Sequence, residues 1–156
     1  MGKEIERKFI VNGDAYKSLA KGVLYRQGYF CSDTRRSIRV RVFNDRGYLT
    51  VKGPSIGATR LEYEYEIPAD EANEMLEFLC ERPIIEKLRY KFQFEGFTWE
   101  IDEFLGENEG LIIAEIELPD ESTVFKKPDW IGREVTGDPR YLNSNLIKNP
   151  YKNFKE

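Results

Sequence analysis

Charged side chains at every second position are the feature that most constrains the fold of this chain. Residues 60–67 read Arg-Leu-Glu-Tyr-Glu-Tyr-Glu-Ile, so charged residues alternate with apolar or aromatic ones. Successive side chains of a β-strand point to opposite faces of the sheet, and a period of two therefore predicts a strand with one charged and one apolar face. The same alternation returns along most of the chain.

Seven further segments have the alternation or the aromatic and β-branched content of strands. They are residues 3–11, 24–31, 35–43, 48–53, 85–94, 97–104 and 111–118. Short turns such as 44–47 and 95–96 join neighbouring segments. Eight strands with short connections predict an antiparallel meander, and closure into a barrel would leave it without edges. The expected fold is α+β but mostly antiparallel β, a closed eight-stranded barrel with a few flanking helices.

Helices are expected at three places. Asp70 is a candidate N-cap for a helix whose apolar stripe contains Ala72, Met75, Leu76 and Leu79. Shorter helices are expected over 14–20 and 139–146. Neither a repeat nor a linker divides the chain, so we expect a single domain over residues 1–156.

Composition narrows the classes of function. The net charge is −4, which provides no general basic field for nucleic acid, and no apolar run is long enough to span a membrane. The first residues are charged where a signal peptide needs an apolar stretch, so a cytoplasmic location is expected. Cys31 and Cys80 lack the spacing of a metal site and are expected to be free thiols.

The sequence contains no histidine. This absence excludes Ser-His-Asp and Cys-His catalysis, and it excludes every histidine-ligated metal site. A metal ion would have to be held by carboxylates, which suits a hard ion such as Mg²⁺ or Mn²⁺.

Like charges share strand faces throughout the chain. The basic pairs are Arg39 with Arg41 and Lys87 with Arg89, whereas the acidic pairs include Glu62 with Glu64, Glu100 with Asp102, and Glu115 with Glu117. An ordinary solvated face is the alternative reading for any one strand. Because neighbouring like charges repel, and because the acids and bases segregate onto different strands, the set as a whole favours a charged barrel interior that binds a metal ion and a phosphate-like anion.

The run Glu4-Ile5-Glu6-Arg7-Lys8 resembles the ExExK signature of the CYTH superfamily, the triphosphate tunnel metalloenzymes. Further segments resemble the family's successive tunnel strands in order, and the tail 130–138 resembles that of its small bacterial members. The matching strand segments are 39–41, 50–53, 60–64, 87–89, Asp102 and 114–118.

This resemblance implies an eight-stranded antiparallel tunnel, open to solvent at its ends, that hydrolyses or transfers a triphosphate with Mg²⁺ or Mn²⁺. Lys8 and Tyr29 would act in catalysis, since Tyr29 is similar to a tyrosine found near the first-strand lysine in some members. The implied phosphate ligands are Lys8, Arg39, Arg41, Lys52, Lys87 and Arg89. The implied metal ligands are Glu4, Glu6, Glu115 and Glu117, helped by Glu62, Glu64 and Asp102.

The function expected first is hydrolysis of inorganic tripolyphosphate, because no evident insertion could shape a nucleoside pocket. A nucleoside or thiamine triphosphatase, and an adenylate cyclase of the class IV type, are enzymatic alternatives. A non-catalytic polyphosphate-binding module is an alternative of another class. The aromatic residues of the C-terminal part would cap the tunnel, form a homodimer interface or pack in the core; they are Trp130, Tyr141, Tyr151 and Phe154.

Overall fold

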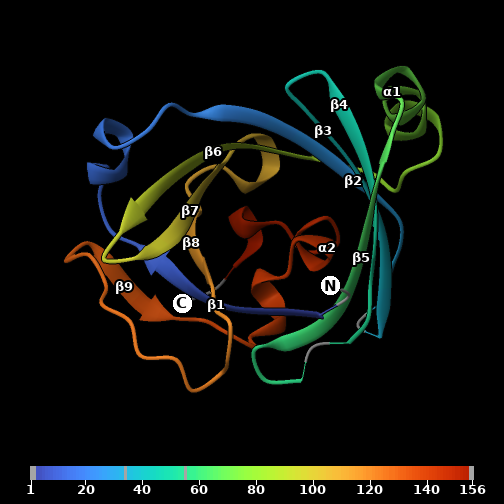
Figure 1. Ribbon diagram of the computed structural model, residues 1–156. Coiled ribbons are helices and arrows are strands. Elements are labelled where there is room, and N and C mark those ends of the chain that lie inside the picture. Colours follow the sequence, from blue (N-terminus) through green and yellow to red (C-terminus); the bar gives the residue numbers. More distant parts are fainter. Residues whose placement is uncertain (1–2, 34, 55, 155–156) are drawn as a thin grey trace.

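A computed structural model describes residues 3–33, 35–54 and 56–154 of this chain, and within them the strands form a closed antiparallel barrel (Figure 1). The predicted strands are confirmed with small changes of boundary, and a short ninth strand flanks the barrel. The strands are β1 (Lys3–Val11), β2 (Val23–Asp33), β3 (Arg36–Phe43), β4 (Arg46–Lys52), β5 (Thr59–Ile67), β6 (Ile85–Phe94), β7 (Phe97–Phe104), β8 (Ile112–Glu117) and β9 (Ile131–Glu134).

The strand order corrects the predicted simple meander. β2 to β5 are consecutive neighbours, and so are β6 to β8, but β2 pairs with β6, and β1 lies between β5 and β8. Two connections between barrel strands, β1 to β2 and β5 to β6, therefore join strands that are not neighbours. One contains the 3₁₀ helix η1 (Ala15–Ser18), which is shorter than the helix expected over 14–20, and the other contains helix α1 (Ala69–Phe78).

Helix α1 packs on the outer face of β3 and β4, where glycines let it approach closely. A Cβ atom on Gly47 would lie 2.6 Å from the Cβ of Ala72, and one on Gly28 would lie 2.8 Å from the Cβ of Cys80. The predicted stripe is buried at Ala72 and Leu76, but Leu79 is exposed. The N-cap is Pro68 instead of Asp70, which lies in the first turn.

The C-terminal part differs more from expectation. The helix expected over 139–146 is divided into a 3₁₀ turn, η3 (Pro139–Tyr141), and helix α2 (Asn143–Leu146), with Leu142 extended between them. Strand β9 was not predicted, because four residues are too few to display an alternation. The 3₁₀ turns η2 (Gly106–Asn108) and η4 (Tyr151–Asn153) were also not predicted.

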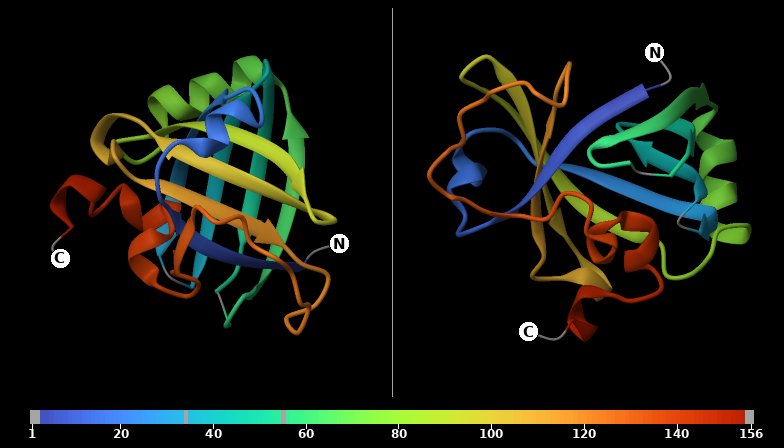
Figure 2. Two further views of the ribbon diagram at one scale, coloured as in Figure 1. Left: turned by 90° about the vertical axis from the view of Figure 1, so that its left-hand side faces the viewer. Right: turned by 90° about the horizontal axis from the view of Figure 1, so that it is seen from below.

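Segment 139–154 lies across one end of the barrel, as the end-on and side views agree (Figures 1 and 2). Tyr141 and Leu146 are buried in an apolar cluster there, and Tyr151 and Phe154 pack against it. Trp130 packs against a second cluster outside β1, β7 and β8. Core packing therefore holds these aromatic residues, and Tyr141, Tyr151 and Phe154 belong to the segment that covers this end, where a tunnel open at its ends was expected. A role in a homodimer interface stays a prediction. No helix in the described part of the chain is both long and apolar enough to cross a membrane.

Candidate active site

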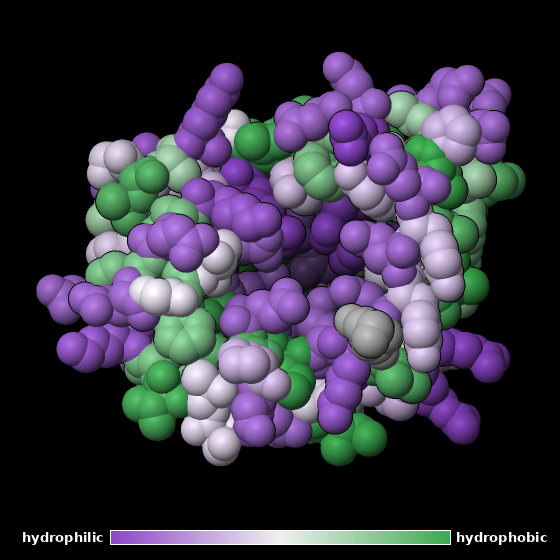
Figure 3. Space-filling model, in the orientation of Figure 1, coloured by the Kyte–Doolittle hydropathy of each residue, from purple (hydrophilic) through white to green (hydrophobic). Residues whose placement is uncertain are grey.

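The barrel interior is a polar cavity of about 210 Å³. From the end opposite segment 139–154 it appears as a hydrophilic hollow (Figure 3). All the predicted site residues except Asp102 line this single cavity, although they come from seven strands. The lining comprises Glu4, Glu6, Lys8, Tyr29, Ser37, Arg39, Arg41, Lys52, Arg60, Glu62, Glu64, Lys87, Arg89, Glu100, Glu115, Glu117, Leu142, Asn143 and Ser144.

The register of the sheet places cations opposite carboxylates on neighbouring strands. Lys8 of β1 is opposite Glu115 of β8, and Lys52 of β4 is opposite Glu62 of β5. Such cross-strand pairs of opposite charge offset the repulsion between like charges along each strand. Other opposed positions hold two acids, Glu6 with Glu117 and Glu100 with Glu115. The bases of β3, β4 and β6 therefore lie on one side of the barrel, and most of the acids lie on the other.

The two arginines of β3 have no charged residue opposite them. Arg39 and Arg41 have Tyr29 and Gln27 beside them on β2, and Thr50 and Tyr48 beside them on β4. Their strand neighbours are therefore uncharged, and an excess of positive charge remains on this wall of the cavity.

The contacts of Arg39 and Arg41 compensate this excess only in part, since Arg39 has one carboxylate partner, Glu64, at 3.6 Å. The Nε of Arg41 donates to Oε1 of Gln27 at 3.0 Å, and no carboxylate of the described residues lies within ion-pair distance of this guanidinium. Burial, with the nearby Arg39 and Arg89, lowers the pKa of Arg41 to about 10. The buried Nε of Arg39 has no hydrogen-bond partner among the described residues. Guanidinium groups in this condition are suited to bind a phosphate-like anion.

Lys87 and Arg89 of β6 share one buried carboxylate. Arg89 forms a bidentate pair with Asp102 at 2.7 and 2.8 Å, and the Nζ of Lys87 lies 2.8 Å from the same carboxylate. The pKa of Asp102 is well below its usual value: burial raises it, but Arg89 and Lys87 lower it by more. Burial also lowers the pKa of Lys87 to about 7. Asp102 lies behind the cavity lining and is the shared counter-ion of these two cations. Its role as a metal ligand stays a prediction.

Carboxylates gather where β1 meets β5 and β8. Lys52 lies 3.5 Å from Glu4 and 3.1 Å from Glu62, and Lys8 lies 3.5 Å from Glu115. Burial and the neighbouring Glu115 and Glu4 raise the pKa of Glu6 to about 8, despite the opposing effect of Lys8 and Lys52. These acids are crowded enough to repel one another, although each side of the group has a lysine.

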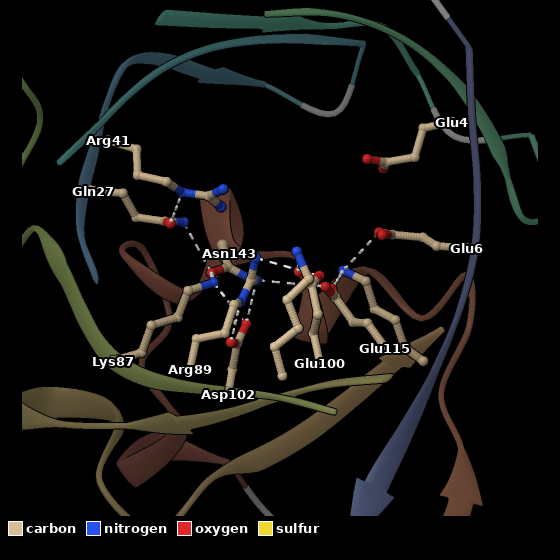
Figure 4. A network of polar contacts seen from close by, with 12 residues as sticks. Glu4, Glu6, Gln27, Arg41, Lys87, Arg89, Glu100, Asp102, Glu115 and Asn143 are labelled. Atoms are coloured by element: carbon tan, nitrogen blue, oxygen red, sulfur yellow. Dashed lines mark hydrogen bonds and ion pairs between the residues drawn. The ribbon is translucent and has the colours of Figure 1, made fainter. Parts of the chain in front are cut away.

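The two ends of the cavity differ in solvent exposure, and its opposite walls differ in charge. Lys87, at the end covered by segment 139–154, is 1% exposed, whereas the side chain of Glu64 at the opposite mouth is 42% exposed. Figure 4 shows Arg41, Lys87 and Arg89 grouped near Asn143, with Glu4 and Glu6 on the opposite wall. The cavity is thus cationic toward its closed end and acidic toward β1.

The crowded acids fit a hard divalent cation by the chemistry of their donors, since the set is all oxygen and its charges repel. The residues that would hold such an ion are Glu4, Glu6, Glu115 and Glu117. No group of three acidic residues in the described part of the chain is already arranged to hold a metal ion. Two of these carboxylates, Glu115 and Glu4, lie within ion-pair distance of Lys8 and Lys52. A bound cation would therefore have to compete with these lysines.

Tyr29, the other predicted catalytic residue, is buried at the cavity wall. Its hydroxyl accepts a hydrogen bond from Nε2 of Gln27 at 3.4 Å, and its ring packs with the cluster at the closed end. The structure places Tyr29 beside Arg39 on the neighbouring strand. Its catalytic role remains a prediction.

Several site residues were not among those predicted. Arg60 and Glu100 belong to strand segments whose alternation already placed them on the charged face, so that pattern could have identified them. Asn143 and Ser144 come from the C-terminal segment, where no periodic pattern points toward the barrel. Gln27 supports the arginine wall from behind the lining.

Arg7, the charged exception on the apolar face of β1, lies outside the barrel. Its guanidinium forms a bidentate pair with Glu134 of β9 at 2.7 and 2.6 Å and lies over the ring of Phe125. The backbone N–H of Lys8 donates to the hydroxyl of Thr136 at 2.9 Å. The unpredicted strand β9 therefore holds β1 from outside.

Known proteins resemble this chain over nearly all its length. A protein from Acetivibrio thermocellus named inorganic triphosphatase is 84% identical over 156 residues, covering 100% of both chains. One of the same name from Nitrosomonas europaea is 35% identical over 151 residues, covering 92% of this chain and 95% of that one.

Solved structures agree. A crystal structure of an inorganic triphosphatase has a TM-score of 0.64 at 33% identity, covering 92% of this chain and 93% of that one. A putative adenylyl cyclase from Hippeastrum, described as having a dominant triphosphatase activity, has a TM-score of 0.60 at 15% identity, covering 75% and 80% of the two chains, and so shares the fold. The CYTH domain model matches residues 2–151. The chain therefore belongs to the CYTH domain family.

Proposed function

We propose that this chain is an inorganic triphosphatase, which hydrolyses a phosphoanhydride bond of tripolyphosphate to give pyrophosphate and orthophosphate. The observation that carries the proposal is the pair of β3 arginines, which faces crowded carboxylates across a closed-ended cavity. Arg41 has no carboxylate partner among the described residues, and the partner of Arg39 is the half-exposed Glu64. A compact polyanion would neutralise the arginines, and a cation bound with it would neutralise the carboxylates. The two relatives named inorganic triphosphatase, at 84% and 35% identity, support the same activity.

The side chains of the cavity would act mainly by charge neutralisation and positioning. Phosphoryl transfer needs the substrate held in line with the attacking water, and it needs charge on the equatorial and leaving oxygens to be stabilised. Arg39 and Arg41 offer planar forks that match phosphate oxygens, whereas Lys8 acts as a point charge. Burial lowers the pKa of Lys8, but Glu115, Glu6 and Glu4 raise it by more, so the ammonium form persists at neutral pH.

We infer a divalent cation as cofactor, held by Glu4, Glu6, Glu115 and Glu117, with Glu62 and Glu64 nearby. Such an ion, Mg²⁺ or Mn²⁺, would supply charge neutralisation at the phosphate oxygens. With no histidine in the chain, a cavity carboxylate is the side chain available to accept the proton of the attacking water. Removal of the ion with a chelator is expected to abolish turnover, and restoring Mg²⁺ or Mn²⁺ should recover it.

A second candidate function is hydrolysis of an organic triphosphate. A neighbouring cavity shares Glu6, Lys8, Arg60 and Leu142 with the first, and the rest of its lining is less charged and includes Ala58, Val135 and Pro139. An organic group attached to the triphosphate could occupy it. This observation keeps nucleoside and thiamine triphosphates as alternative substrates.

The proposal is tested with a panel of substrates. Tripolyphosphate, ATP and thiamine triphosphate are each supplied with Mg²⁺ or Mn²⁺, and orthophosphate and cyclic AMP are measured. The highest kcat/KM is expected with tripolyphosphate. Cyclic AMP as the main product would overturn the proposal, and tight binding without turnover of any compound would favour a binding module.

Two variants test the assigned roles. Lys8→Ala removes the cation beside the carboxylates, and Glu117→Ala removes a metal-ligand candidate, so each is expected to lower kcat/KM by at least about 100-fold, as loss of a transition-state charge contact does. Phosphate release measures activity, and an unchanged circular dichroism spectrum confirms the fold. Normal activity in either variant would contradict the assignment.

We also propose a cytoplasmic location, for which the free thiols of Cys31 and Cys80 offer support.

Self-association stays a prediction. Val51, Leu61, Tyr63 and Tyr65 form an exposed apolar strip on the outer face of β4 and β5, which is a candidate contact surface. Light scattering at several concentrations would distinguish a monomer from a dimer.

A further inference from the structure

Asn143 occupies a distinctive place at the closed end of the cavity. It begins helix α2, which lies against β2, and it is among the residues that line the cavity. In Figure 4 its amide lies between Gln27 and Lys87. No charge or periodic pattern in the sequence pointed to it, and the proposed mechanism does not use it.

A chain of hydrogen bonds determines how the Asn143 amide is oriented. The Nε of Arg41 can only donate, so Gln27 must present its oxygen to Arg41 and its Nε2 to Asn143. The Nζ of Lys87 also donates, at 2.9 Å. Oδ1 of Asn143 therefore accepts two hydrogen bonds, at 3.0 Å from Gln27 and 2.9 Å from Lys87. A flipped amide would place N–H groups against two donors.

The consequence lies on the other side of the amide. Asn143 lines the cavity, and because Oδ1 takes both of these hydrogen bonds, its Nδ2 group is the part of the amide that remains for a ligand. Nδ2 forms no hydrogen bond with the described residues. Nδ2 carries two hydrogens that can be donated. The group is also uncharged, so it can contact an anion without adding to the repulsion among Arg39, Arg41, Lys87 and Arg89.

We propose that Asn143 is a further substrate-binding residue, whose Nδ2 donates a hydrogen bond to an oxygen of the phosphoryl group held at the closed end of the cavity. The inference rests on the proposed triphosphatase function and deepens it. It gives segment 139–154 a direct part in the site: the segment closes the barrel and also supplies a donor to the substrate. Gln27 and Lys87 then act partly as positioning residues, because they hold the amide in the donating orientation.

Three variants test this role. Asn143→Ala removes both the acceptor and the donor. Asn143→Asp keeps an oxygen for Gln27 and Lys87 to contact but removes the donor. Ser144→Asp places the same charge on the adjacent lining residue and leaves Asn143 intact, so it controls for repulsion of the substrate and for the burial of a new charge. For each, kcat and KM are determined with tripolyphosphate, and thermal unfolding without substrate reports on the fold.

Asn143→Ala is expected to lower kcat/KM by about 10- to 100-fold, the range for one hydrogen bond to a charged group. Asn143→Asp is expected to lose more than Ser144→Asp, because it combines repulsion with loss of the donor. The inference is overturned if Asn143→Ala stays within twofold of the wild type, or if Asn143→Asp is no worse than Ser144→Asp. If Asn143→Ala fails to fold, the comparison of the two aspartate variants still decides.

The outcome also separates this inference from the proposed function. An active wild-type enzyme with unaffected Asn143 variants would remove only the role of Asn143. A wild-type protein that neither binds nor hydrolyses tripolyphosphate would remove the proposed function itself.

Discussion

At the scale of single residues, the arginines of β3 best link structure to activity. Burying a cation without a counter-ion costs free energy, and this chain does so with Arg41, whose neighbours across the sheet are uncharged. Such a residue contributes to anion binding at the expense of stability. The pair of Arg89 with Asp102 is the contrasting case, since each charge there is satisfied within the protein.

The first prediction follows from this contrast. Arg41→Met is expected to change the free energy of unfolding by less than about 1 kcal/mol, because loss of the Gln27 hydrogen bond is offset by relief of the buried charge. Arg89→Met should destabilise by about 3 kcal/mol or more, since it leaves Asp102 buried without its main partner. Denaturant unfolding of both variants measures the difference, and equal losses would refute the distinction.

At the scale of elements, helix α1 depends on two glycines of the barrel wall. The second prediction is that Gly47→Ala destabilises the protein by about 1–3 kcal/mol, because the new Cβ would lie 2.6 Å from the Cβ of Ala72 and 3.0 Å from the carbonyl oxygen of Ile67. Gly53→Ala is the matched control: its Cβ would meet Leu61 at an ordinary 3.6 Å. Chemical denaturation compares them, and equal stability of the two variants would contradict this view of the packing.

The ion pair between Arg7 of β1 and Glu134 of β9 gives a third prediction, on how stability depends on pH. The hydrogen bond from Arg7 lowers the pKa of Glu134, so the pair stabilises the fold above the unfolded pKa of about 4.3 and loses that effect as pH falls through the lower folded value. Glu134→Gln should therefore be less stable than the wild type at pH 7, by about 0.5 kcal/mol for a partly exposed pair. The difference should vanish toward pH 3. A difference that is constant over this range would indicate packing instead of charge.

At the scale of the whole molecule, closure of the barrel determines which charged side chains face one another across the cavity. The strands have short local contacts within β2–β5 and β6–β8, but β1 is placed by long-range pairing with β5 and β8. This placement brings Glu4, Glu6 and Lys8 opposite the arginine wall. The strand that resembles the family signature is thus the one that closes the barrel.

The fourth prediction belongs to this scale. Because ligand binding draws the equilibrium toward the folded state, tripolyphosphate at 100 times its Kd should stabilise the protein by about 2.7 kcal/mol. The thermal shift is measured in a chelator to prevent turnover, and it should shrink at high salt as the charges are screened. Sodium chloride at matched ionic strength is the control. A shift unchanged in Arg41→Met would argue against the arginine wall as the binding surface.

The sequence by itself determined which side chains share a face, because a strand's period of two is a local property of the backbone. That is why the alternation at residues 39–41, 60–64 and 115–117, together with the family resemblance, predicted most of the cavity lining. Order around the barrel, the counter-ion role of Asp102 and the amide of Asn143 were decided only by the tertiary structure. Each depends on contacts between segments far apart in the chain, and no local pattern encodes the pairing of β1 with β8 or the return of segment 139–154 to the closed end.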